Sequence, residues 1–136
     1  MSRSEYVDDL DTWATIRWRG AVSSAIRGAR GQALLREMLI ALDGMPIKRL
    51  AKNAFADQSG DFCAIGVLGK SRGMDASEFS RLLDMDINDI AKLFGVADAL
   101  LREIMEENDN GTWRRETHEE RWERMREWVN NNLITK

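Results

Sequence analysis

The chain has one cysteine, one proline and one histidine, and it has no long apolar run. Because Cys63 is the sole thiol, an internal disulfide and a multi-cysteine zinc site are both excluded. The apolar runs, such as residues 38–42 and 64–68, are far shorter than the ~20 residues that cross a membrane. Acidic residues occupy the region where a secretion signal would be apolar, so we expect a cytoplasmic protein. No phosphate-binding or dinucleotide glycine motif is present, and we expect no cofactor.

The length and the apolar content indicate one domain that spans residues 1–136. With 136 residues, of which 43% are hydrophobic, the chain can build a single core. Helical spacing of the apolar residues predicts a mainly α fold, a compact bundle of about five to six helices. The segment 48–62 is the least helical, and its Asp57–Asp61 turn allows a small β-hairpin.

Local signals place most of these helices. Asp11 or Thr12 can begin the first, in which Trp13, Ile16, Gly20 and Ser24 share one face, with Gly20 open to close approach by another backbone. Two glycines within residues 27–31 predict a break before a second helix at 32–42. Further helices are expected after Cys63, at 87–94, at 96–107 and after the capping box formed by Thr117 and Glu120.

The net charge of −3 hides a regional asymmetry. Residues 12–49 contain seven basic and two acidic side chains, whereas residues 98–127 contain ten acidic side chains and six arginines. One interpretation is that the front half attracts anions; the other is that the two halves neutralise each other across the fold.

The segment 13–31 is chemically the most suggestive. Arginine forks bind phosphates in a bidentate manner, and a tryptophan face can stack on a nucleobase. We therefore predict a ligand site at Arg17, Trp18, Arg19, Arg27 and Arg30. The alternative is that Trp13 and Ile16 lie in the core while the arginines pair with the acidic C-terminal helices.

Five tryptophans are a high number for this length, and they can serve as interface anchors or as core residues. A second hypothesis therefore places a protein partner on the acidic helices, with contacts from Trp113, Glu119, Trp122 and Glu123. The same tryptophans would suit a homo-oligomer.

Residues 89–104 have the spacing of a helix-turn-helix, with a glycine at the turn, which suggests a transcriptional regulator. The second helix, however, carries Asp98, Glu103, Glu106 and Glu107 against a single Arg102. Because phosphates repel such a helix, we expect a structural helical pair and no DNA binding.

Cys63 follows a turn and begins a helix, a position that can activate a thiol, and His118 is the single histidine available as a base. A Cys63-dependent hydrolase is therefore an alternative. The apolar neighbours Phe62, Ala64 and Ile65 favour a buried structural cysteine, and we expect no enzyme.

Three landmarks resemble small phage- and prophage-encoded proteins of uncharacterised function. They are Trp18-Arg-Gly-Ala-Val with the following Ala25-Ile-Arg-Gly, then Cys63-Ala-Ile-Gly, and finally Asn108-Asp109 before Glu116-Thr117 and Glu120-Arg-Trp122. The resemblance implies a binding protein that antagonises bacterial defence from the host cytoplasm. Its expected partner is a phosphate-bearing nucleotide immune signal or, alternatively, a host defence protein.

Overall fold

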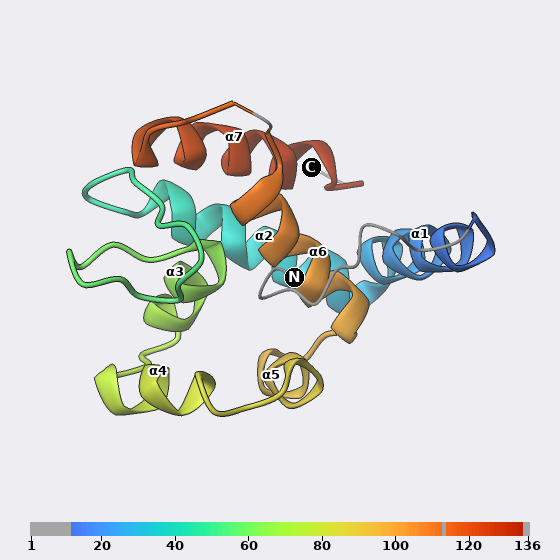
Figure 1. The fold of residues 1–136 in the computed structure, drawn as a ribbon, viewed down its shortest axis with the longest axis horizontal. Helices are drawn as coiled ribbons and strands as arrows, with labels where there is room; N and C mark the ends of the chain where they lie inside the picture. Colours follow the sequence, from blue (N-terminus) through green and yellow to red (C-terminus); the bar gives the residue numbers. More distant parts are fainter. Residues whose placement is uncertain (1–11, 113, 135–136) are drawn as a thin grey trace.

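A computed structural model describes residues 12–112 and 114–134, and this part of the chain forms seven α-helices and no β-strand (Figure 1). The helix α2 lies in the middle of the molecule and contacts α1, α3 and α7, while α6 contacts α1, α3, α5 and α7. The elements in chain order are α1 (Thr12–Arg27), α2 (Ala29–Asp43), α3 (Ala64–Ser71), α4 (Ala76–Leu82), α5 (Ile87–Phe94), α6 (Asp98–Asn110) and α7 (His118–Asn131).

The mainly α class is confirmed, whereas five to six helices were too few. The element that was not expected is α4, whose N-cap Asp75 and residue Glu78 form a capping box. This box is visible in the sequence, but α4 has just two buried apolar residues, Phe79 and Leu82, so its periodicity is weak. None of the helices in the described ranges combines the length and the apolarity that a membrane span requires.

The prediction of a possible β-hairpin between residues 48 and 62 is wrong, because this segment forms a loop without β-strands. A single antiparallel bridge joins Ala56 to Phe62. The loop backbone bonds in part to the helices behind it, because the Leu50 N–H donates to the His118 carbonyl at 3.0 Å and the Asn108 amide donates to the Ala51 carbonyl at 2.9 Å. These bonds use groups that a regular ladder would have paired.

The break between α1 and α2 lies at Gly28, as the glycine content predicted, but α2 begins earlier than expected and includes Gly31. Gly31 is buried, and a Cβ atom there would overlap the carbonyl oxygen of Ala25 in α1. The absence of a side chain at this position therefore lets the two helices turn sharply and pack at their junction.

The predicted inner face of α1 is wrong. Trp13 and Ile16 are 73% and 54% exposed, and nothing lies within 4 Å of a Cβ built on Gly20. The buried residue of α1 is Val22 instead. The helix extends from the body in Figure 1, so few of its side chains can reach the core.

A single core joins the other helices. The largest fully buried side chains come from α2, the following loop, and α3, α4, α6 and α7: Leu35, Met38, Leu42, Leu50, Ile65, Leu68, Leu82, Leu100, Leu101, Ile104, Met125 and Val129. Burial of each large apolar side chain contributes roughly 1.5–3 kcal/mol.

A buried polar pair at the end of α6 holds the loop against this core. Asn108 donates to the Ala51 carbonyl and accepts from the Ala64 N–H at 3.1 Å, where α3 begins. Asp109 accepts from the Asn53 N–H at 3.0 Å and from the Asn108 amide at 2.9 Å. Asn108 and Asp109 are buried, so their polar atoms would be costly to leave unpaired.

Two arginines of α7 extend the network. Arg121 donates to the Leu50 carbonyl at 3.0 Å, and Arg124 donates to the Asn108 carbonyl and to Glu116. Burial alone would raise the pKa of Glu116, but the hydrogen bond and charge of Arg124, aided by the Arg121 charge, outweigh it and lower that pKa.

The substitution Gly31→Ala should lower the free energy of unfolding by at least about 2 kcal/mol, because the new methyl group overlaps the Ala25 backbone. Urea unfolding measures this change. The matched substitution Gly20→Ala enters open space inside α1 and should stabilise by about 0.5–1 kcal/mol. Equal effects from the two substitutions would contradict the helix junction described above.

Substitution of Glu116 by Gln should destabilise the protein by about 2 kcal/mol at pH 7. Because the folded pKa of Glu116 lies below its ordinary value of 4.5, its contribution is complete above that pH and is lost as the pH falls through the folded pKa. The stability difference between wild type and Glu116→Gln should therefore shrink in urea titrations below about pH 4.5. If the stability difference between wild type and Glu116→Gln did not change with pH, it would not arise from the ionised Glu116 carboxylate. Glu123→Gln, at an exposed site, is the control.

Candidate functional site

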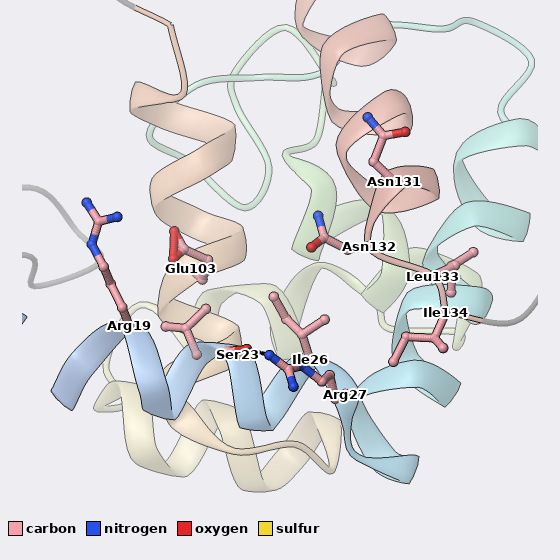
Figure 2. A pocket seen from close by; sticks show the side chains of 10 residues that line it. Arg19, Ser23, Ile26, Arg27, Glu103, Asn131, Asn132, Leu133 and Ile134 are labelled. Carbon is pink, nitrogen blue, oxygen red and sulfur yellow. Dashed lines mark hydrogen bonds between the residues drawn. The ribbon is translucent and has the colours of Figure 1, made fainter. Parts of the chain in front are cut away.

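A pocket of about 440 Å³ lies between α1, α6 and the end of α7 (Figure 2). Arg19, Ser23 and Arg27 of α1 form one wall, and Asn131 and Asn132 at the end of α7 form the opposite wall. The remaining lining comprises Val22, Ile26, Glu103, Leu133 and Ile134. The volume falls within the ~300–1,000 Å³ of small-molecule sites, and the lining mixes apolar and polar groups as those sites do.

Helical spacing places the α1 groups together. Arg19, Ser23 and Arg27 follow one another at intervals of four residues, which puts them on the same side of the helix. The Arg27 guanidinium donates to the Ser23 hydroxyl at 2.6 Å, so the hydroxyl holds the arginine along the wall. Both arginines are exposed, which leaves N–H donors available to a ligand.

A buried glutamine of α2 fixes the opposite wall. The Gln32 amide donates to the carbonyls of Ile26 and Asn132 at 2.7 and 3.0 Å, and its oxygen accepts from the Ile134 N–H at 3.0 Å. Gln32 thus ties the end of α1 to the segment that follows α7. Local sequence patterns do not indicate Gln32, Asn131 and Asn132 as pocket residues, because the two segments are about a hundred residues apart.

Most arginines of the front half, residues 12–49, form no ion pair with a carboxylate in the described part of the chain. The two acidic residues of the front half are engaged elsewhere, because Glu37 binds Arg72 at 2.7 Å and Asp43 binds Arg126 at 2.6 Å. The hydrogen bonds from these arginines lower the pKa of each carboxyl group. Within the described ranges, the front-half arginines that make no ion pair are Arg17, Arg19, Arg27, Arg30 and Arg36. The positive front half therefore keeps an anion-attracting edge.

The structure brings together two of the five residues predicted to bind a ligand. Arg19 and Arg27 line the pocket, whereas Arg17, Trp18 and Arg30 do not. Arg17 lies two positions from Arg19, about 200° around the helix. Trp18 is half-buried and has the Arg102 guanidinium of α6 6.0 Å from its ring centre. Arg30 is exposed in the first turn of α2.

The residues predicted to contact a protein partner are divided between surface and core. Glu119 and Glu123 are exposed on α7, while Trp122 is buried and donates its indole N–H to the Leu42 carbonyl at 3.1 Å. The Trp122 side chain is therefore part of the core. Trp113 lies outside the described residues.

The helix-turn-helix spacing corresponds to α5 and α6, joined at Gly95 with a φ of +78°. The second of these helices has seven buried residues and lies against α1, α3, α5 and α7. A helix enclosed in this way offers little surface to a DNA groove. Its packing favours the structural interpretation of the motif.

Cys63 and His118 have different partners. The Cys63 thiol is 0% exposed and accepts the Gly66 N–H at 3.4 Å as the N-cap of α3. His118, at the first position of α7, binds Asp61 through Nδ1 at 2.8 Å. This burial of the thiol favours the structural role of Cys63.

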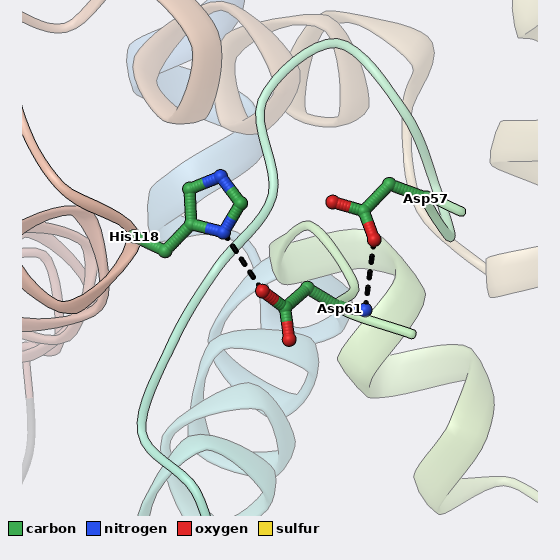
Figure 3. A group of neighbouring side chains, drawn as sticks. All are labelled: Asp57, Asp61 and His118. Atoms are coloured by element: carbon green, nitrogen blue, oxygen red, sulfur yellow. Dashed lines mark hydrogen bonds and ion pairs between the residues drawn. The ribbon is translucent and has the colours of Figure 1, made fainter. Parts of the chain in front are cut away.

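A cluster of Asp57, Asp61 and His118 joins the loop to α7 (Figure 3). One oxygen of Asp61 accepts from Arg49 at 2.9 Å and the other lies 2.8 Å from His118. Asp57 accepts from the Ser59 hydroxyl and from two backbone N–H groups of the turn, and the Ser59 hydrogen bond is the main cause of its lowered pKa. The three residues could offer ligand atoms to a metal ion, but these hydrogen bonds already account for their arrangement.

Comparisons with protein-family models, with curated proteins and with solved structures found no match. The function must therefore be argued from the pocket itself.

The substitution His118→Ala should lower the free energy of unfolding by about 1 kcal/mol, because it removes the bond from α7 to Asp61. Urea unfolding at pH 7 measures the loss. The neighbouring exposed residue supplies the control, and Glu119→Ala should change stability by less than about 0.5 kcal/mol. If His118→Ala also changed the free energy of unfolding by less than this amount, the contact between His118 and Asp61 would not stabilise the attachment of the loop.

Proposed function

We propose that this chain is a non-catalytic binding protein that holds a phosphate-bearing small molecule in the pocket between α1 and the end of α7. The observation that carries the proposal is the position of Arg19 and Arg27 on one wall of a pocket of about 440 Å³. Guanidinium forks bind phosphate oxygens in pairs, and neither arginine is committed to a carboxylate within the described part of the chain.

The other lining groups suit the rest of a nucleotide. Val22, Ile26 and Leu133 offer apolar surface to a base or a sugar, and the side-chain amides of Asn131 and Asn132 can bond polar base edges. A lining that combines arginines, side-chain amides and apolar surface matches the chemistry of a nucleotide better than that of inorganic phosphate.

Glu103 is the one carboxylate among the described residues of the lining, which also holds the two arginines. The role proposed for this lining is retention of a ligand.

The biological role that we propose is sequestration of a nucleotide immune signal in the cytoplasm of a bacterial host, by a protein that antagonises defence. The resemblance to phage-encoded proteins supports this role, and the uncompensated arginines of α1 support the class of ligand.

The test is thermal unfolding of the purified protein against a panel of cyclic and ADP-ribose-derived nucleotides. A ligand at a hundred times its dissociation constant stabilises the folded state by about 2.7 kcal/mol. This stabilisation should raise the midpoint of a domain of this size by several degrees. We expect a selective shift with at least one nucleotide, and the shift should be abolished in the double variant Arg19→Ala with Arg27→Ala.

Arg17→Ala provides the matched control, because Arg17 is an equally exposed arginine of α1 that does not line the pocket. This variant should retain the shift. Equal loss in Arg17→Ala and in the double variant would indicate nonspecific attraction to the basic helix. The absence of a shift with every nucleotide would refute the proposal.

A further inference from the structure

Two hollows lie between the loop of residues 45–62 and the helices α3 and α4, on a part of the surface that the nucleotide pocket does not include. Their volumes are about 370 and 380 Å³, and both are lined by Phe62 and Lys70. Phe62 and Lys70 therefore lie at the boundary between the two hollows, which are together called the trough.

The walls of the trough are mostly apolar. Ile47 and Val67 line the first hollow, and Phe79 and Leu83 line the second. Ile47 and Leu83 are 63% and 75% exposed, so each hollow has apolar surface that faces solvent. Exposed apolar surface that continues across several elements is typical of an interaction site.

Lys70 is the one cation of the trough that is not committed to an acidic group within the described residues. The other cation, Arg49, pairs with Asp61, which also binds His118. The second carboxylate, Asp75, caps α4 and accepts from Ser77 and from the Glu78 N–H. An occupant that carries a carboxylate at the level of Lys70 would complement this charge.

We infer that the trough binds an extended peptide segment of a partner protein in which an acidic residue stands between two large apolar residues. In an extended chain the residues i, i+2 and i+4 point to the same side. Such a segment can therefore place one apolar side chain in each hollow and its carboxylate at Lys70, the residue that the hollows share.

The position of Lys70 argues for a peptide and against a fatty acid. A fatty acid has its carboxylate at one end, and it could fill just one hollow while its charge pairs with Lys70. The trough, in contrast, has apolar surface on both sides of the cation. A peptide can satisfy all three positions at once.

The test is a nuclear magnetic resonance titration of the ¹⁵N-labelled full chain with the peptide acetyl-Leu-Ser-Asp-Ser-Leu-amide. We expect amide shifts concentrated at Phe62, Lys70, Phe79 and Leu83. Replacement of the peptide Asp by Asn should weaken binding, and Lys70→Glu should weaken it by about tenfold, because attraction becomes repulsion. Lys92→Glu reverses the charge of an exposed lysine of α5 outside the trough, and it should leave peptide binding unchanged.

The substitution Leu83→Ser provides a second variant, at an exposed position. It should weaken binding of the peptide and change the midpoint of thermal unfolding of the protein by no more than a few degrees. The inference is overturned if millimolar peptide shifts no amide of the trough, or if Lys70→Glu and Lys92→Glu behave alike. It is also overturned if octanoate fills the trough while the peptide does not.

Discussion

The structure depends above all on the hydrogen bonds of one buried side chain, Asn108. Its amide N–H donates to the Ala51 carbonyl and its oxygen accepts from the Ala64 N–H, so one residue of α6 binds both the long loop and the start of α3. Asp109 and Arg121 bind the same loop at Asn53 and Leu50. The loop contains no regular secondary structure in residues 45–62, and these bonds substitute for the ladder that it lacks.

This attachment determines what the loop can present to solvent. Because its inner backbone groups are satisfied by α6 and α7, the apolar residues Ile47 and Phe62 can line an open surface without unfolding of the loop. The bond from Asp61 to His118 adds a further connection near the same surface. The trough is therefore a consequence of buried polar contacts behind it.

Ion pairs elsewhere in the fold determine the charge of the pocket between α1 and the end of α7. Arg72, the C-cap of α3, and Arg126 of α7 neutralise Glu37 and Asp43, the two carboxylates that could have balanced the front half of the chain. The arginines of α1 consequently remain a positive edge in an acidic protein. Local sequence spacing put Arg19, Ser23 and Arg27 on one side of α1, and tertiary packing placed the end of α7 opposite them.

Sequence by itself determined the regional charge, which follows from composition. It also determined the helical class, the break at Gly28 and the capped start of α7, because each depends on residues within one or two helical turns of one another. Of the five residues that it predicted to bind a ligand, Arg19 and Arg27 line the pocket and the other three do not. Tertiary structure alone decided that Trp122 is buried, that Trp13 is exposed, and that Gln32 joins α1 to the end of the chain. These outcomes depend on contacts between distant segments, whose relative positions no local spacing encodes.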